Sequence, residues 1–188
     1  MTIVVAMYFN RFMLTRLQRD AERLALSDPL TGISNRRCFN RYVQEQLDAE
    51  LPSEFAIVMI DLDNFKRVNS EHGHRVGDQV LRAIADSLDA VAREDDCIAR
   101  VGGDEFAAVL PGVEVDGARA LAERFVRAVS ETPEAARSGV GASAGFALFP
   151  LHGQTLDQLV FTADSALMAV KATGKGSARV ARIVSAVG

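Results

Sequence analysis

The sequence predicts an α+β domain in which a mixed β-sheet carries helices on one face. Residues 55–60 form a continuous apolar run, which is typical of a central strand buried on both faces. Residues 97–101 and 106–110 predict two further strands, joined by Gly102-Gly103-Asp104-Glu105 in a hairpin turn. Four segments show helical periodicity instead: residues 35–51, 77–93, 115–130 and 156–173.

The remaining segments connect or extend these elements. Asp28-Pro29-Leu30-Thr31-Gly32 predicts a turn, and the polar stretch after residue 60 predicts a loop. Residues 140–149 predict a strand, and residues 178–184 predict a last short strand. Both would join the sheet around the central run.

Residues 1–26 differ from the rest of the chain, because they contain no Gly or Pro and predict one helix. Apolar residues recur there at spacings of four and three, with Asn10 filling one position, as in a dimeric coiled coil. The recurring residues are Ile3, Met7, Leu14, Leu17, Ala21 and Leu24. An amphipathic helix packed on its own domain is the alternative. We expect a signalling helix over residues 1–26 and a second domain over residues 27–188.

Composition indicates an ordinary folded domain with no attraction to nucleic acid. The chain has 188 residues and a formal net charge of −4, which excludes a globally basic surface. Cys38 and Cys97 stand far apart and predict two reduced thiols. Met1–Tyr8 is apolar but too short to span a bilayer, and it lacks the features of a signal peptide. We expect a cytoplasmic protein, or the cytoplasmic part of a membrane-anchored one with an upstream sensor.

Four acidic residues lie at the ends of predicted strands. Asp61 and Asp63 follow the central run, whereas Asp104 and Glu105 lie in the hairpin turn. If the two strands are neighbours, Asp61 and the hairpin acids converge, and clustered carboxylates repel one another unless a cation neutralises them. Mg²⁺ commonly bridges carboxylates to substrate phosphates, so the cluster indicates phosphoryl or nucleotidyl transfer. Taken alone, Gly-Gly-Asp would be only a good hairpin turn.

Several spaced motifs together resemble the GGDEF domain of diguanylate cyclases over residues 28–184. They are Asp28-Pro29-Leu30-Thr31-Gly32 with Asn35-Arg36-Arg37, Asp61-Leu62-Asp63-Asn64-Phe65-Lys66, Asn69 with Gly73-His74 and Gly77-Asp78, Arg100-Val101-Gly102-Gly103-Asp104-Glu105-Phe106, Ser143-Ala144-Gly145-Phe146-Ala147, and Ala163-Asp164-Ser165-Ala166-Leu167 with Lys171. The resemblance implies a palm-like fold, similar to ferredoxin-like and nucleotidyl cyclase-like domains, with a mainly antiparallel central sheet flanked by helices. It also implies a nucleotidyltransferase that condenses two GTP molecules into cyclic di-GMP and two pyrophosphates.

The resemblance assigns the acidic cluster to metal binding and catalysis. Asp61, the backbone carbonyl of Leu62, Asp104 and Glu105 correspond to ligands of Mg²⁺, with Mn²⁺ as the alternative ion. Asp104 or Glu105 would take the proton of the ribose 3′-hydroxyl, and the sequence leaves open which of them does so. Lys66 corresponds to a lysine near the transferred phosphates.

Asn69 and Asp78 correspond to the residues that read guanine. A carboxylate can accept hydrogen bonds from both N1 and N2 of guanine, whereas adenine has no donor at N1. The alternative for Asp78 is the N-cap of the following helix, a position that favours Asp.

Four further residues correspond to contacts with the phosphates and the nucleotide. Lys171 and Lys175, placed one helical turn apart, would clamp the terminal phosphate. Gly102 and Gly103 would let the backbone approach the nucleotide closely. The chain departs from the family pattern at Lys175-Gly176, where Arg-Asn is usual, and lacks an aromatic residue after Leu167. Lys replaces Arg as a charge but not as a bidentate donor, so weaker GTP binding is expected there.

Arg93 and Asp96 match the RxxD inhibitory site of the family, and Asp96 stands six residues ahead of Gly102. Arg can donate to O6 and N7 of guanine, and Asp can accept from N1 and N2, so this pair would bind the product. The alternative is an arginine in the last turn of a helix, where it favours the helix dipole.

The resemblance implies a dimer, because each domain binds one GTP and the two domains must face each other. We expect a homodimer through the N-terminal helix, with GTP as substrate and cyclic di-GMP as product and inhibitor. Two other hypotheses are a catalytically silent nucleotide receptor and a nucleotidyl cyclase or polymerase-like enzyme with another substrate.

Overall fold

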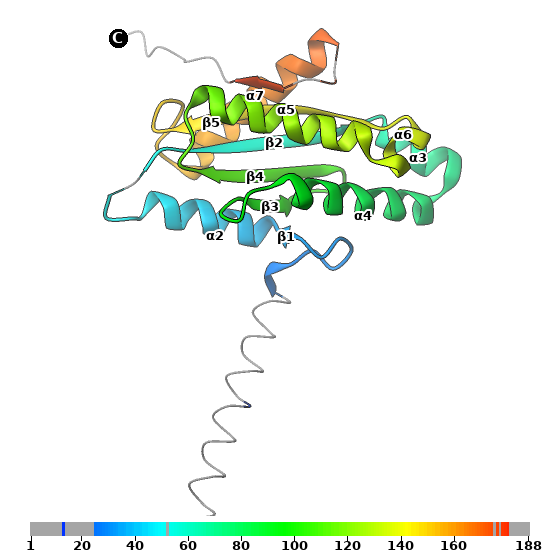
Figure 1. Ribbon diagram of the computed structural model, residues 1–188, viewed down its shortest axis with the longest axis horizontal. Coiled ribbons are helices and arrows are strands. Elements are labelled where there is room, and N and C mark those ends of the chain that lie inside the picture. The colour runs from blue at the N-terminus through cyan, green and yellow to red at the C-terminus, as the bar shows by residue number, and fades with distance from the viewer. Residues whose placement is uncertain (1–12, 14–24, 52, 175, 177, 181–188) are drawn as a thin grey trace, which may run out of the picture.

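Strand β2 (Phe55–Asp63) lies in the middle of a six-stranded sheet in the computed structural model, which describes residues 13, 25–51, 53–174, 176 and 178–180. The strand order is β1-β3-β4-β2-β5-β6 (Figure 1). The other strands are β1 (Ser34–Asn35), β3 (Cys97–Arg100), β4 (Glu105–Pro111), β5 (Gly141–Phe149) and β6 (Ala178–Val180). The pairs β2–β4, β2–β5 and β3–β4 are antiparallel, whereas β1–β3 and β5–β6 are parallel. The sheet is therefore mainly antiparallel, as the sequence predicted.

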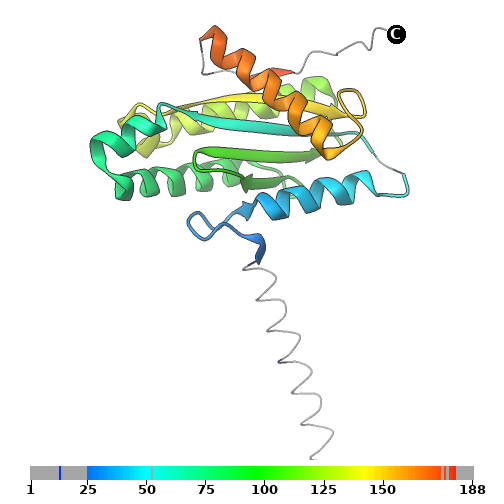
Figure 2. The same cartoon turned by 180° about the vertical axis from the view of Figure 1, so that it is seen from behind.

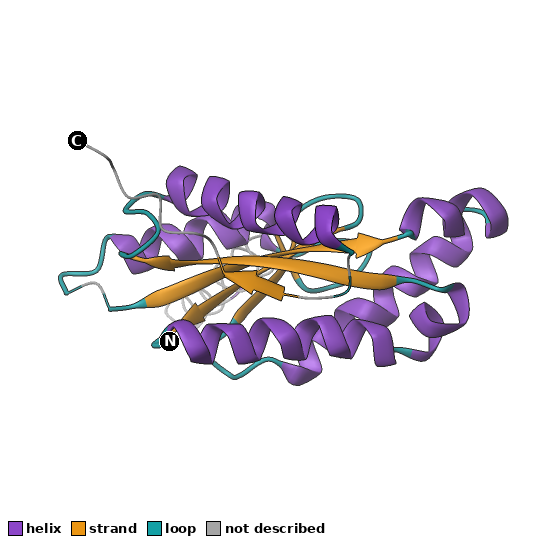
Figure 3. Cartoon of the chain, turned by 90° about the horizontal axis from the view of Figure 1, so that it is seen from above, coloured by secondary structure: helices purple, strands orange, loops and turns teal. Residues whose placement is uncertain are grey.

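Helices cover both faces of this sheet (Figures 2 and 3), so the expectation of helices on one face was wrong. One face packs on α3 (Phe65–His72), α4 (His74–Val91), α5 (Val115–Glu131) and α6 (Pro133–Ser138); the other packs on α2 (Arg36–Leu47) and α7 (Leu156–Thr173). The reason lies in β2, because successive side chains of a strand point to opposite faces. Val58 and Ile60 belong to the first core, whereas Ile57 and Met59 belong to the second.

The segment after residue 60 is not the loop that its polar composition predicted. Strand β2 continues to Asp63, and the eight-residue helix α3 follows. Asn64 connects the strand to the helix. It adopts a left-handed conformation with φ 67°, which Asn tolerates better than most residues. Phe65 and Val68 then bury one side of α3, while its other side is polar. A short amphipathic helix with two buried residues has too few apolar positions for its period to be recognised.

Most of the predicted signalling helix lies outside the described residues, and so does the stretch 181–184 of the predicted last strand. The coiled coil therefore remains a prediction. Among the helices of the described ranges, none is both long and apolar enough to cross a bilayer.

Candidate functional site

A cavity of about 440 Å³ opens where β2 meets α3 and the β3–β4 hairpin. Six of the residues that the sequence assigned to the site line it, together with three of their neighbours. The lining residues are Asp61, Leu62, Asp63, Asn64, Phe65, Lys66, Asp104, Glu105 and Lys171. The tertiary structure thus brings together acids from β2 and the hairpin turn with basic residues from α3 and α7.

The acidic residues converge because β2 and β4 are paired. Asp61 and Glu105 stand directly opposite each other in the antiparallel register, so their side chains share one face of the sheet. Asp104 precedes β4, and its carbonyl oxygen accepts a hydrogen bond of 3.1 Å from the Leu62 N–H. The hairpin turn is therefore tied to the strand that carries Asp61.

Two basic side chains contact the carboxylates. Lys171 Nζ lies 2.5 Å from Asp61 Oδ1, and Arg36 Nη2 lies 3.6 Å from Glu105 Oε2. Arg36 also donates from Nε to the Val101 carbonyl at 2.7 Å, which fixes it beside the hairpin. Arg36 belongs to one of the motifs in the sequence, but no role was predicted for it. Its contact with Glu105 becomes visible only because α2 packs beside the hairpin.

The carboxylate oxygens fit a hard cation such as Mg²⁺ by their chemistry. Asp61, Asp104 and Glu105 present oxygen donors to one cavity, which Leu62 also lines. Within the described ranges, however, no three His, Cys, Asp or Glu side chains are already arranged around one point. Since Asp61 and Glu105 pair with Lys171 and Arg36, a cation would bind there in exchange for these contacts.

The glycines of the hairpin differ in their surroundings. A Cβ on Gly102 would lie 2.2 Å from Glu105 Oε2, because the Glu105 side chain folds back over this residue. A Cβ on Gly103 would have no atom within 4 Å, and Gly103 is exposed. A side chain at position 102 would therefore require the Glu105 side chain to move, whereas Gly103 leaves open space above the backbone.

Asp164 on α7 is a titratable neighbour to which the sequence assigned no role. Burial raises the pKa of its carboxyl, repulsion from Glu105 adds to this rise, and Arg36 opposes it. Asp164 therefore belongs to the same electrostatic cluster as Glu105 and Arg36. Its signal in the sequence was its place in the Ala163–Leu167 motif.

Of the two other lysines predicted to contact the phosphates, Lys66 lines the cavity and Lys175 lies outside the described residues. Lys66 is exposed in the first turn of α3 and lines the cavity, and its contact with the phosphates stays a prediction. Helix α7 ends at Thr173 with Gly174 as C-cap, so the helical face that was to join Lys171 to Lys175 is interrupted. Lys175 itself lies outside the described residues.

Asn69 and Asp78 do not line the cavity but lie on the neighbouring helices α3 and α4. A Cβ on Gly77 would lie 2.1 Å from Asn69 Oδ1, so the absence of a side chain at Gly77 lets the two helices bring Asn69 against α4. Asp78 is the next residue of that helix. It is not the N-cap that the alternative interpretation proposed, because α4 begins at His74 and is capped by Gly73.

Arg93 and Asp96 form a tight turn between α4 and β3. The Arg93 N–H donates to Asp96 Oδ2 at 2.8 Å, and the Arg93 side chain is exposed. Asp96 lines a second cavity of about 530 Å³, together with Tyr42, Cys38 and Cys97. Both cysteines are free, and burial raises the pKa of Cys97 to about 11, so this residue is an uncharged thiol.

Comparison with known proteins gives one consistent family. The family model described as "Diguanylate cyclase, GGDEF domain" matches residues 25–177. The bifunctional diguanylate cyclase/cyclic di-GMP phosphodiesterase MucR of Pseudomonas aeruginosa is 37% identical over 166 residues, which are 86% of this chain and 24% of that protein. The probable diguanylate cyclase DgcT of Escherichia coli is 32% identical over 98% of this chain and 41% of its own. The chain thus spans less than half the length of these curated relatives.

Solved structures of similar fold include two that align with more than nine-tenths of this chain. Diguanylate cyclase SiaD of Pseudomonas aeruginosa, solved with its activator SiaC, has a TM-score of 0.77 and 31% identity over 94% of this chain and 70% of that one. The coiled coil and GGDEF domain of DgcB from Caulobacter crescentus, solved with c-di-GMP, has a TM-score of 0.76 and 26% identity over 96% of this chain and 100% of that one.

Proposed function

Because the chain belongs to the GGDEF family of diguanylate cyclase domains, we propose that it condenses two GTP molecules into cyclic di-GMP. The observation that carries this proposal is the convergence of Asp61, Asp104 and Glu105 beside Lys66 and Lys171 in one cavity. A cavity that contains both metal-binding acids and lysines suits a triphosphate whose charge must be neutralised while one phosphorus is attacked.

The reaction consists of two equivalent transfers. The 3′-oxygen of one GTP attacks the α-phosphorus of the other, a new P–O bond forms, and the bond to the β-phosphate breaks to release pyrophosphate. Asp104 or Glu105 accepts the proton of the 3′-hydroxyl. The second transfer closes the ring, so that two GTP yield one cyclic dinucleotide and two pyrophosphates.

Mg²⁺, with Mn²⁺ as the alternative, would be held by Asp61, Asp104, Glu105 and the Leu62 carbonyl. When bound, such a cation supplies charge stabilisation to the phosphate oxygens. Lys171 would give up its contact with Asp61 when a cation binds, and its ammonium group would then be available to the phosphates, since both groups line the same cavity. Lys66, and Lys175 beyond α7, provide further positive charge for the triphosphate.

Guanine is read by Asn69, which lies against α4 at Gly77, and by Asp78, the next residue of that helix. Gly102 and Gly103 form the backbone beside the nucleotide, and the open space above Gly103 supports this assignment. ATP lacks the N1 donor that the Asp78 carboxylate needs, so the enzyme prefers GTP.

One domain supplies only one GTP, so catalysis requires a homodimer whose two cavities face each other. The heptads of residues 1–26 would set that orientation. Arg93 and Asp96 would bind the cyclic product and inhibit the enzyme. In support of this role, Asp96 borders a cavity, and its Oδ1 atom is buried without a hydrogen-bond partner in the described part of the chain.

The deciding experiment incubates the protein with GTP and Mg²⁺ and measures cyclic di-GMP and pyrophosphate by chromatography. We expect both products from GTP, a rate from ATP at least about 100-fold lower, and inhibition by added cyclic di-GMP that Arg93→Ala relieves. Asp104→Asn should abolish turnover. Binding of GTP without any product would favour the silent nucleotide receptor, and comparable rates from ATP would contradict the role of Asp78.

A further inference from the structure

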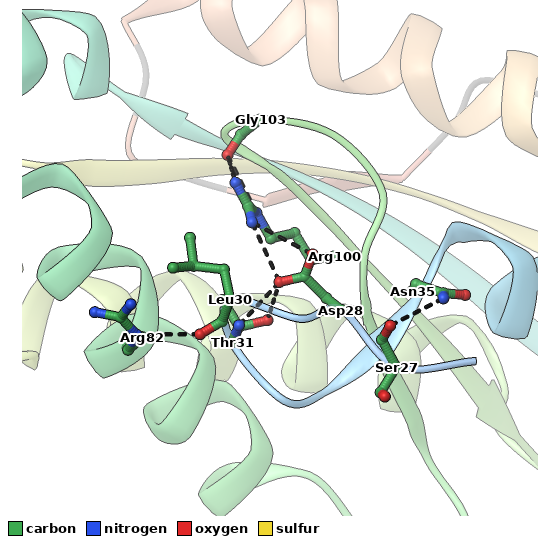
Figure 4. A network of polar contacts seen from close by, with 8 residues as sticks. All are labelled: Ser27, Asp28, Leu30, Thr31, Asn35, Arg82, Arg100 and Gly103. Atoms are coloured by element: carbon green, nitrogen blue, oxygen red, sulfur yellow. Dashed lines mark hydrogen bonds and ion pairs between the residues drawn. The ribbon is translucent and has the colours of Figure 1, made fainter. Parts of the chain in front are cut away.

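Arg100 connects the hairpin turn to the beginning of the domain (Figure 4). Its Nη2 and Nε atoms donate to the Gly103 carbonyl at 2.7 and 3.3 Å, while Nη1 lies 3.2 Å from Asp28 Oδ1. The side chain of Arg100 is 14% exposed and that of Asp28 16%, so this ion pair is largely removed from solvent. A guanidinium group can make these contacts simultaneously because its donors are arranged in a fixed plane.

Asp28 is held in place independently of Arg100. Its Oδ1 atom accepts hydrogen bonds from the Thr31 N–H at 2.9 Å and from Thr31 Oγ1 at 2.7 Å. Burial by itself would raise the pKa of Asp28, but the hydrogen bonds from Thr31 and the contact with Arg100 outweigh burial and lower it. The carboxylate is thus a fixed, charged anchor for the guanidinium group.

The backbone on both sides of Asp104 is therefore restrained. The preceding carbonyl, that of Gly103, is held by Arg100, and the carbonyl of Asp104 itself is held by the Leu62 N–H. The second restraint comes from the strand that carries Asp61. The first comes from Arg100 at the end of β3, and its anchor Asp28 belongs to the turn at residues 28–32, which is remote from the cavity in sequence.

The same turn contacts the helix assigned to guanine recognition. Arg82 Nε donates to the Leu30 carbonyl at 3.1 Å, and Arg82 lies one helical turn after Asp78 on α4. On its other side, Asn35 Nδ2 donates to the carbonyls of Ala25 and Ser27 at 3.0 Å each. The turn at residues 28–32 therefore links residues 25–27 to two parts of the site, namely the hairpin through Arg100 and helix α4 through Arg82.

We propose that Arg100, anchored by Asp28, is a positioning residue that sets the Gly103–Asp104 peptide for catalysis and couples it to the chain segment entering the domain. The proposal rests on the cyclase function proposed above and adds a specific means by which an N-terminal segment reaches the acid Asp104. Neither Asp28 nor Arg100 lines the catalytic cavity, so both act through the backbone of the turn.

The test compares Arg100→Lys and Asp28→Asn with the matched control Arg137→Lys, which alters an exposed pair with Glu134 on α6. Lysine keeps the charge but cannot reach both partners. We expect kcat to fall about tenfold or more in Arg100→Lys while KM for GTP stays within about twofold. Asp28→Asn should lower kcat in the same direction, and the double variant should lose no more than Arg100→Lys alone, since both act on one contact. The control should match the wild type.

A second measurement is independent of turnover. Amide hydrogen exchange of the peptide covering residues 101–106 should be faster in both variants, with exchange in α5 unchanged. An unchanged kcat, a loss expressed only in KM, or unaltered exchange in this peptide would overturn the positioning role. If the wild type makes no cyclic di-GMP, the proposed function fails, whereas the exchange data still decide whether Arg100 and Asp28 hold the turn.

Discussion

The ammonium group of Lys171 lies 2.5 Å from the carboxylate of Asp61, although the two residues are 110 positions apart in the sequence. The contact places the end of α7 over the end of β2, within the cavity that also holds the hairpin acids. A lysine in this position can neutralise the carboxylate before substrate arrives and the phosphates afterwards.

Replacement of Lys171 by Gln should therefore have two opposite effects. KM for GTP should rise about tenfold or more, because a charge-assisted contact of about 1.5–3 kcal/mol is lost. Binding of Mg²⁺ without nucleotide should tighten, because Asp61 no longer shares its charge with an ammonium group. Calorimetric titration with Mg²⁺ and steady-state kinetics measure the two effects. Arg41→Gln, at an exposed pair with Glu45, is the control; equal Mg²⁺ binding in both variants would contradict the exchange of partners.

Gly145→Ala should displace α7 from the sheet. A Cβ at this position would lie 2.2 Å from the Ala163 carbonyl oxygen and from the Leu167 backbone nitrogen, and backbone atoms cannot rotate away. We expect a loss of at least about 1–3 kcal/mol in the free energy of unfolding, together with weaker GTP binding, since the helix carries Lys171.

The matched control for this substitution is Gly117→Ala in α5, where the new Cβ would meet Val113 Cβ at 3.8 Å, an ordinary contact. This variant should be stabilised by about 0.5 kcal/mol through its helix propensity. Denaturant unfolding measures both changes. If the two alanines had equal effects, close packing at Gly145 would not be what places α7.

Ser143→Ala should destabilise the fold beneath the site. Ser143 Oγ donates to Asp63 Oδ2 at 2.8 Å, and both residues are buried. Removing a donor from a buried carboxylate costs about 1–3 kcal/mol, which thermal unfolding would detect. The control is Ser165→Ala on the exposed side of α7, where the hydroxyl donates to the Phe161 carbonyl of its own helix. A loss of stability no larger than that of the control would show that the Ser143 contact contributes little.

Stability should also fall as the solution becomes acidic because of His152. Its Nδ1 atom accepts a hydrogen bond of 2.9 Å from the Leu148 N–H, and burial lowers the pKa of the imidazole below 6.5. The unfolded chain then binds this proton more readily than the folded chain, so the free energy of unfolding decreases as the pH falls below about 6.5. Urea unfolding between pH 7.5 and 5 should show a shallower pH dependence in His152→Asn than in the wild type. An equal slope in the two proteins would contradict this role of His152.

The sequence by itself determined the central strand, the hairpin and the acids. The continuous apolar run at residues 55–60 has no amphipathic period, so it must be buried on both faces. The positions of Asp61, Asp104 and Glu105 at strand ends do not depend on the order of the strands in the sheet. Helix α7 was predicted at residues 156–173 from its periodicity, and these are its observed bounds, with Thr155 as N-cap and Gly174 as C-cap.

Only the tertiary structure decided which faces the helices cover and which distant groups meet. The contacts of Lys171 with Asp61, Arg36 with Glu105 and Arg100 with Asp28 join residues that no local period relates. Helix α3 was not predicted either, because two apolar residues in eight do not define a helical period, and their burial depends on the core against which they pack. The physical reason is the same in each case: local sequence sets backbone preference, whereas strand order and helix packing determine which side chains share a site.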